Sequence, residues 1–386
     1  MDWKQHIDKE KIVGWRRYLH MHPEVAFQEK ETSAYIAKTL ENMPGMEVLW
    51  PAETSVIGVL KGGKPGKVVG IRAEIDALPM QEEADVEFKS LNSGVMHACG
   101  HDIHTACVLG AASVLSSIRD KLCGTVKFIF QAAEEVLPGG AQTIVDSGIV
   151  SDCQYFLGLH VLAQLGTGKI SCWPGPLTAS NDKFHITVTG KSGHWYAPES
   201  MLDVVTVGTH IVSSLNSIVS RNISPHDNVV LAVNSFVSDP ELSPDGPKAE
   251  LSGFLATKSN EIRYFIHERM KEIVAGVCDA HGANYEFDIT VGFDPIINDG
   301  YLTALVQETV KEFYGEDMLV RPRVLMASDD YSAFHQIAPQ VFFLVGSGSP
   351  EEGYEYFVHN TKYKANEDIL PIGSEMFVAL TLKLLG

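Results

Sequence analysis

The sequence predicts an α/β protein whose metal-binding domain has a mostly parallel central sheet and is interrupted by an inserted α+β domain. Strand and helix patterns alternate through the first part of the chain, and a β-α-β-β-α-β order replaces this alternation in the middle. A chain of 386 residues also exceeds the usual size of a single hydrophobic core. We therefore expect two domains.

The first part of the chain has the order typical of a parallel sheet with helices on its faces. In such sheets, functional side chains gather at the carboxyl ends of the strands. Candidate residues follow or end three predicted strands: Asp76, the pair Glu134 and Glu135, and His160. The predicted elements are a β-branched strand at 68–75, a small and apolar helix at 105–118, and strands at 125–130 and 155–160.

The middle of the chain predicts a ferredoxin-like unit at 179–293, so that residues 1–178 and 294–386 together form the other domain. Ser259 is the expected N-cap of its second helix, with Glu261 in the first turn. The elements expected in and after this unit are a strand at 183–188, a helix at 201–219, strands at 228–237 and 249–255, a helix to about 280, a strand at 284–291, a strand at 341–345 and a helix near 372–384.

Composition excludes several classes of protein. A hydrophobic content of 45% and a charged content of 20% are those of a folded chain. A net charge of −19 argues against a nucleic-acid partner, because phosphate binding needs clustered Lys and Arg. The N-terminus has no apolar signal core, no run is long enough to span a membrane, and the six scattered cysteines are interpreted as reduced thiols. We expect a cytoplasmic protein with a small-molecule partner and no membrane partner.

Residues 97–104 are the most informative segment of the chain. They read His-Ala-Cys-Gly-His-Asp-Ile-His, which collects three imidazoles, a thiol and a carboxylate. Cys and His are preferred ligands of borderline-soft divalent metals, and a nearby carboxylate completes or orients such sites. The segment alone leaves open whether a metal is structural, catalytic or absent.

Further candidates lie elsewhere in the chain. Glu134 and Glu135 repel each other at the end of an apolar strand; a surface turn accommodates both, whereas beside a metal one could ligate while the other acts as general base. Taken alone, His160 and His359 are more typical of satisfied core histidines than of ligands. Asp76 is a candidate for orienting a ligating histidine.

Six motifs in the same order give the chain a resemblance to the zinc-peptidase-like amidohydrolases. This family includes hippurate hydrolases, aminoacylases and auxin-conjugate hydrolases, with carboxypeptidases as more distant relatives. The resemblance implies a metal-binding α/β domain interrupted by a ferredoxin-like lid or dimerisation domain, and a homodimer or higher homo-oligomer. The motifs that carry it are 19–24, 72–79, 96–104, 131–135, 158–160 and 359–360.

The resemblance also implies a site with two divalent metal ions, most simply Zn or Mn, with Co or Ni as alternatives. A metal-bound hydroxide would attack an amide carbonyl, with Glu134 as the general base and acid. His194 would stabilise the oxyanion across the dimer, and Asp76 is included among the catalytic residues. His20, His22, His97 and His104 would have structural or supporting roles. The implied metal ligands are Cys99 as a bridging thiolate, His101, Glu135, His160 and His359.

The predicted inserted domain departs from the family pattern. Relatives carry an Asn before one strand and an Arg after it, both associated with a substrate carboxylate, but residues 241–245 lack that Asn and residues 253–258 lack that Arg. Because an Arg fork is the ordinary carboxylate receptor, we expect a less typical amide, aromatic or without that carboxylate. Lys258 is a candidate substitute for the Arg.

Three further positions differ in size from the family pattern. Trp195 and Tyr196 stand where small residues are usual, and an aromatic substrate could pack against them; Asp329 replaces a customary Glu. The leading hypothesis is a metal-dependent amidohydrolase acting on a small N-acyl amino acid or related amide. The alternatives are a dipeptidase or carboxypeptidase, and a non-catalytic ligand-binding relative.

Overall fold

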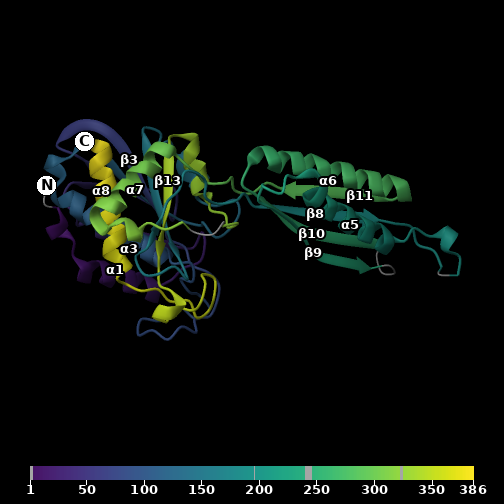
Figure 1. Ribbon diagram of the computed structural model, residues 1–386. Coiled ribbons are helices and arrows are strands. Elements are labelled where there is room, and N and C mark those ends of the chain that lie inside the picture. The colour runs from purple at the N-terminus through teal and green to yellow at the C-terminus, as the bar shows by residue number, and fades with distance from the viewer. Residues whose placement is uncertain (1–2, 195, 240–245, 322–324) are drawn as a thin grey trace. The chain divides into compact units, whose positions relative to one another are not determined.

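The computed structural model describes residues 3–194, 196–239, 246–321 and 325–386, which form two compact units (Figure 1). Within these residues, unit 1 comprises 3–175, 297–321 and 330–386. Unit 2 comprises the described part of 176–296 together with 325–329. Its main segment thus begins and ends three residues outside the expected 179–293, and the short segment before residue 330 is an addition that the sequence pattern did not indicate.

Unit 1 is built on a seven-stranded sheet in the order β1-β2-β4-β3-β5-β13-β6. The four strands β4, β3, β5 and β13 are mutually parallel, whereas β2 pairs antiparallel with β4, β6 pairs antiparallel with β13, and the edge strand β1 pairs antiparallel with β2. The predicted α/β class with a largely parallel sheet is confirmed. The strands are β1 (Met46–Leu49), β2 (Val56–Lys61), β3 (Lys64–Glu74), β4 (Cys123–Gln131), β5 (Tyr155–Leu162), β6 (Ile170–Ser171) and β13 (Gln340–Gly346). A separate two-stranded sheet pairs β7 (Gly175–Pro176) with β12 (Ile297–Asn298).

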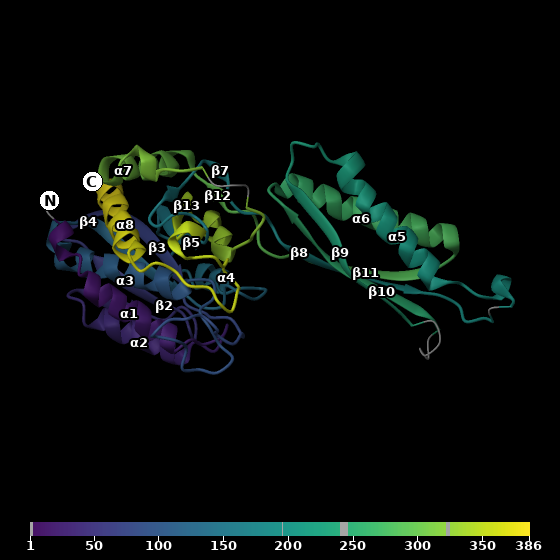
Figure 2. The ribbon, with the colours of Figure 1, turned by 60° about the horizontal axis from the view of Figure 1, so that its bottom comes forward.

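Both faces of the unit 1 sheet are covered (Figure 2). Helices α3 and α8 pack on β3 and on each other, and Gly110 of α3 makes this close approach possible, because a Cβ there would lie 2.3 Å from the Ser374 hydroxyl. On the other face, Phe156 and Phe342 contact Phe334 and Tyr331 of a 3-10 helix at Asp330–Gln336. The helices are α1 (Lys9–Met21), α2 (Lys30–Glu41), α3 (His101–Ser117), α4 (Ala141–Asp146), α7 (Gly300–Tyr314) and α8 (Ile369–Leu385).

Unit 2 has a four-stranded antiparallel sheet in the order β11-β8-β10-β9, with two long helices packed on one face. Its elements follow the β-α-β-β-α-β order, and Ser259 caps α6 as the sequence indicates. Helix α5 begins later than expected because Asp203 accepts the Val205 N–H at 2.9 Å and so marks its start. The elements are β8 (Asp182–Thr189), α5 (Val204–Asn222), β9 (Val229–Asp239), β10 (Lys248–Thr257), α6 (Asn260–His281) and β11 (Asn284–Thr290).

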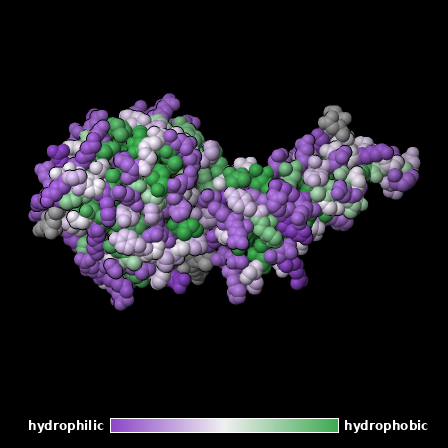
Figure 3. Space-filling model, turned by 90° about the horizontal axis from the view of Figure 1, so that it is seen from above, coloured by the Kyte–Doolittle hydropathy of each residue, from purple (hydrophilic) through white to green (hydrophobic). Residues whose placement is uncertain are grey.

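The surface of unit 1 mixes polar and apolar residues. On the face drawn in Figure 3, hydrophilic residues predominate and hydrophobic residues form small groups between them. No helix within the described ranges is both long and apolar enough to cross a membrane.

A buried ion-pair network joins the first and the last residues of the main segment of unit 2. Asp182, at the start of β8, is only 1% exposed and accepts from Arg263 Nε at 2.8 Å, His267 Nε2 at 2.7 Å and the Gly292 N–H at 2.9 Å. Arg263 also donates to Asp294 at 2.7 Å. Burial alone would raise the pKa of Asp182, but these donors outweigh it and lower the pKa to about 2.

We expect the substitution Arg263→Met to lower the free energy of unfolding of unit 2 by about 3–5 kcal/mol, because it leaves the Asp182 carboxylate buried without its main partner. Since folding lowers the pKa of Asp182, its contribution is complete above the unfolded value of about 3.9 and is lost as the pH falls through the folded value. Urea unfolding of both proteins at pH 7, and of the wild type at a series of acidic pH values, measures these effects.

The matched control for this prediction is Arg269→Met, which removes an exposed arginine from the same helix. Arg269 bonds Glu272 at 2.7 Å three residues along the helix, a pair that contributes less than about 1 kcal/mol. Equal losses of stability in the two variants would contradict a special role for the buried network.

Candidate metal centre

The parallel strands bring the predicted site residues to one edge of the unit 1 sheet. Asp76 lies two residues beyond β3, Glu134 and Glu135 lie beyond β4, and His160 lies near the carboxyl end of β5, at the same edge. Cys99 and His101 flank Gly100, the N-cap of α3. Gly100 has φ +89°, and a Cβ there would meet Val161 at 2.5 Å, so only glycine fits between these two side chains.

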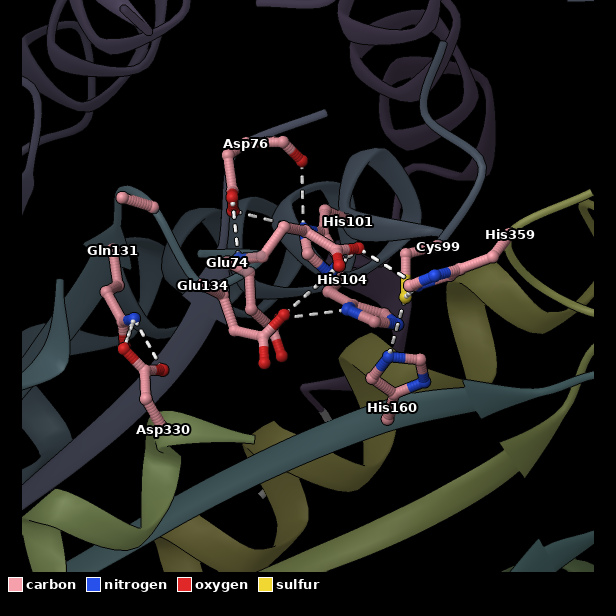
Figure 4. Close-up of polar contacts among 12 residues, drawn as sticks. Glu74, Asp76, Cys99, His101, His104, Gln131, Glu134, His160, Asp330 and His359 are labelled. Carbon is pink, nitrogen blue, oxygen red and sulfur yellow. Dashed lines mark hydrogen bonds and ion pairs between the residues drawn. The ribbon is translucent and has the colours of Figure 1, made fainter. Parts of the chain in front are cut away.

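The thiol of Cys99 is the point at which the predicted ligands meet (Figure 4). Its Sγ lies 3.4 Å from His160 Nε2 and 3.3 Å from His359 Nε2, and His359 Nε2 lies 3.2 Å from Glu135 Oε1. Ligand atoms of Cys99, His101 and Glu135 all lie within 4.8 Å of one another. The structure thus gathers all five residues of the expected ligand set into one cluster.

The histidines present the nitrogen that a metal would need. His160 donates from Nδ1 to the Val161 carbonyl at 2.6 Å, and His101 donates from Nδ1 to the Asp76 carbonyl at 2.8 Å. Metal-ligating histidines usually donate their second ring N–H to such an oxygen. His101 Nε2 is buried, has no hydrogen-bond partner among the described residues, and lies 3.9 Å from both Glu134 Oε2 and Glu135 Oε1. A divalent ion fits this mixed S, N and O donor set.

The electrostatics of the cluster also favour a cation. Burial raises the pKa of the Cys99 thiol, and Glu135, Glu134 and Glu74 raise it further. Burial alone would lower the pKa of His101, but Asp76, Glu74 and Glu135 outweigh it and raise the pKa to about 10. Acidic groups therefore dominate the site, and a bound cation would replace the protons that they otherwise retain.

Asp76 connects two of the expected ligands. Its Oδ2 accepts the backbone N–H of Glu135 at 3.0 Å, and its Oδ1 lies 3.3 Å from His101 Nδ1. The side chain is almost completely buried. Asp76 thus fixes the ring orientation of His101 through its backbone carbonyl and the backbone of Glu135 through its carboxylate.

Two neighbouring residues are close to the cluster but are occupied by other bonds. His104 donates from Nδ1 to Glu74 at 2.9 Å, and its Nε2 accepts the Val161 N–H at 2.9 Å. Glu74 also pairs with the buried Arg72, so its pKa lies well below the ordinary value even though burial alone would raise it. No lone pair at His104 remains for a metal.

The remaining motif histidines lie in or near α1. His20 bonds Asp102 at 2.8 Å and Glu82 at 3.1 Å, and the same Asp102 oxygen lies 2.8 Å from Arg16 Nε, which ties α1 to the start of α3. His22 donates to the Tyr18 carbonyl at 2.8 Å. His97 is buried beside this network, and its ring centroid lies 6.4 Å from that of His20.

Sequence reasoning missed two side chains that hold the segment carrying both glutamates. Ser55 Oγ accepts the Ala132 N–H at 3.1 Å, and Glu29 Oε1 accepts the Ala133 N–H at 2.8 Å. Glu29 stands at the start of α2, where a carboxylate predicts an ordinary helix cap. That pattern gave no sign of a contact 104 residues away in the chain.

The candidate residues for substrate recognition belong to unit 2. His194 is exposed in the segment after β8, with its ring centroid 4.2 Å from that of Tyr196, whereas Trp195 and residues 241–245 lie outside the described residues. The ammonium group of Lys258 donates to the backbone carbonyls of Leu177 at 2.9 Å and Pro176 at 3.3 Å. These bonds occupy two of the three N–H donors of the Lys258 ammonium group.

Comparisons with known proteins agree with this arrangement. The sequence pattern of peptidase family M20/M25/M40 matches residues 70–383. The N-acyl-L-amino acid amidohydrolase of Geobacillus stearothermophilus is 41% identical over 297 residues, which cover 76% of this chain and 80% of that protein. A solved structure from methicillin resistant Staphylococcus aureus matches with a TM-score of 0.93 at 32% identity, covering 99% of both chains. A dinuclear metal binding peptidase from Bacillus subtilis matches with a TM-score of 0.85 at 30% identity, covering 98% of both chains.

These matches span most of the chain and include the cluster around Cys99. They confirm the resemblance that the six motifs indicated, and with it a metal-dependent hydrolase acting on amide C–N bonds. The chain belongs to peptidase family M20/M25/M40.

Proposed function

We propose that this enzyme cleaves the amide bond of a small N-acyl amino acid or a related N-acyl or aromatic amide. The observation that carries the proposal is the cluster around Cys99 Sγ, where His160 and His359 direct Nε2 toward the thiol and the unpartnered Nε2 of His101 lies close by. The relative from Geobacillus stearothermophilus is an N-acyl-L-amino acid amidohydrolase, which supports this class of substrate.

Two divalent ions per subunit are part of the proposal. The ligands would be Cys99, His101, Glu135, His160 and His359, and the related Bacillus subtilis structure is that of a dinuclear metal binding peptidase. Cys99 would supply a thiolate to this ligand set, and its Sγ lies close to both His160 Nε2 and His359 Nε2. Mixed S, N and O ligands favour Zn or Mn, with Co or Ni as alternatives.

The metal pair, when bound, would supply Lewis acidity, which polarises the amide carbonyl and makes water a stronger acid. Glu134, nearly buried and 3.9 Å from His101 Nε2, accepts the proton of the attacking water and passes it to the departing amine nitrogen. Asp76 fixes the orientation of the His101 ring and the position of the Glu135 backbone during this proton transfer.

His194 would stabilise the oxyanion in the active site of a second copy of the chain. This role requires a dimer, and unit 2 offers a surface for one. Strand β9 is an edge strand that pairs with β10 and exposes Phe236 and Val237, features that favour association with another copy.

The substrate proposal follows the residues available in unit 2. Lys258 donates to backbone carbonyls and residues 253–258 contain no Arg, so these positions offer no Arg fork for a substrate carboxylate. The 73% exposed Tyr196 offers an aromatic surface instead. An amide with an aromatic group or without a free α-carboxylate therefore fits best, and a dipeptidase or carboxypeptidase activity is less favoured. The ordered base and ligand cluster also disfavours a non-catalytic relative.

All six cysteines lie within the described residues and carry free thiols. Reduced cysteines are typical of proteins in reducing compartments. We therefore propose the cytoplasm as the location of the enzyme.

Glu134→Gln and Cys99→Ala test the assignments of base and ligand as a matched pair. Glu134→Gln should lower kcat by about a hundredfold to ten-thousandfold while the metal content is retained, because it removes only the proton acceptor. Cys99→Ala should lower the metal content itself, because it removes the central thiolate. Elemental analysis and amide hydrolysis with and without chelator measure both. Near-normal turnover in the first variant, or unchanged metal stoichiometry in the second, would refute the corresponding role.

Mixing two inactive variants tests whether His194 acts across the dimer. His194→Ala alone should lower kcat by about a hundredfold to a thousandfold, the effect of removing one oxyanion donor. After subunit exchange with Glu134→Gln chains, about a quarter of the wild-type activity should return, because half of the dimers are mixed and each has one intact site. Exchange that is demonstrated by mass spectrometry but restores no activity would contradict action in trans.

A panel of N-acyl amino acids, the matching carboxamides and aromatic amides tests the substrate class. Because residues 253–258 contain no Arg fork to receive a carboxylate, we expect kcat/KM for the carboxamides to equal or exceed that for the free acids. A strong preference for the free acids would contradict this proposal while leaving the metal centre unaffected.

A further inference from the structure

The segment that carries the base and a metal ligand is held by side chains from three distant places in the chain. Three backbone N–H groups of this segment donate to these side chains. The N–H of Ala132 donates to Ser55 Oγ, that of Ala133 to Glu29 Oε1, and that of Glu135 to Asp76 Oδ2. Asp76 has a place in the expected site, but Glu29 is assigned no role by the motifs or by the proposed reaction.

Glu29 is unusual among helix-capping residues. It is the N-cap of α2 and is completely buried, yet its side chain makes no capping bond to its own helix within the described residues. Glu24 does this instead, accepting the N–H groups of Glu31 at 3.2 Å and Thr32 at 2.8 Å. Glu29 Oε1 accepts the backbone N–H of Ala133 at 2.8 Å instead.

The backbone that Glu29 contacts adopts an unfavourable conformation. Ala133 has φ +56°, in the left-handed region that residues with a Cβ rarely adopt. It lies between the end of β4 and the two glutamates, so its conformation sets the direction in which both leave the sheet edge. Such backbone persists only where surrounding contacts impose it, and the Glu29 bond is one of these contacts.

Burying the carboxyl group of Glu29 at this place carries a desolvation penalty. Burial raises the pKa of Glu29 to about 7, and the nearby charge of Asp76 contributes in the same direction, while the backbone bonds oppose it. An apolar side chain of similar size would fill the volume without that desolvation cost. What such a side chain lacks is an acceptor for the Ala133 N–H.

We propose that Glu29 is a positioning residue for the reaction, whose side-chain oxygen holds Ala133 in the left-handed conformation and so sets the positions of Glu134 and Glu135. This inference rests on the proposed function, because it takes Glu134 as the base and Glu135 as a ligand. Its effect should appear in kcat and in metal affinity together, since the two glutamates share one segment of backbone.

The first test compares Glu29→Met, which removes the acceptor, with Glu29→Gln, which keeps a side-chain oxygen in its place. Glu29→Met should lower kcat and metal affinity by about tenfold to a hundredfold with little change in KM, the range found for groups that orient metal ligands. Glu29→Gln should stay within about threefold of the wild type in both. Metal affinity is measured by competition with a chelator, independently of turnover.

The control is Glu24→Met, which removes the cap of α2 but leaves the Ala133 contact untouched. It should lower the thermal midpoint, while metal affinity stays within about twofold of the wild type. This variant separates damage to α2 from loss of the contact at Ala133.

A double-mutant cycle tests the link to backbone conformation. Glycine adopts positive φ without a Cβ penalty, so Ala133→Gly should have little effect alone and should restore at least about fivefold of the metal affinity lost in Glu29→Met. Unchanged metal affinity in Glu29→Met, equal losses in Glu29→Gln or Glu24→Met, or the absence of coupling to Ala133→Gly would overturn the proposal. A wild-type enzyme that binds no metal would instead refute the proposed function.

Discussion

The concentration of buried carboxylates at the carboxyl edge of β3, β4 and β5 is the constraint on which the rest of unit 1 depends. Glu74, Asp76 and Glu135 are drawn to one edge because parallel strands end together there. Arg72 pairs with Glu74 and His104 donates to it, and the carboxylates of this edge together raise the pKa values of His101 and Cys99. The site is therefore arranged to receive positive charge, and the cluster around Cys99 places donor atoms where a divalent ion would supply it.

At this edge, different acidic residues hold different parts of the site in place. Asp76 orients His101 and accepts the Glu135 N–H, while Glu29 accepts the N–H of the strained Ala133. Asp102, next to His101 in the chain, bonds His20 and lies against Arg16, and so anchors the first turn of α3 to α1. Each carboxylate thus satisfies backbone or cationic donors that would otherwise be buried without partners.

Charged side chains also join segments of unit 2 that are distant in the sequence. Arg263 donates to Asp182 near the start of the unit and to Asp294 near the end of its main segment, and Lys258 donates to the carbonyls of residues 176 and 177. The candidate recognition residues His194 and Tyr196 are exposed. The two rings lie beside each other, with their centroids 4.2 Å apart.

The sequence by itself determined the α/β class, the position of the inserted β-α-β-β-α-β segment and the cluster of metal-binding residue types at 97–104, because these depend on local periodicity and on side-chain chemistry. It also determined the Ser259 cap, a bond that spans only three residues. Only the tertiary structure decided that His104 bonds Glu74 and Val161, that Lys258 donates to the carbonyls of Pro176 and Leu177, and that Glu29 bonds the backbone of Ala133. The physical reason is that each of these bonds pairs residues far apart in the chain, so the fate of a donor or acceptor is settled by which strands and helices become neighbours.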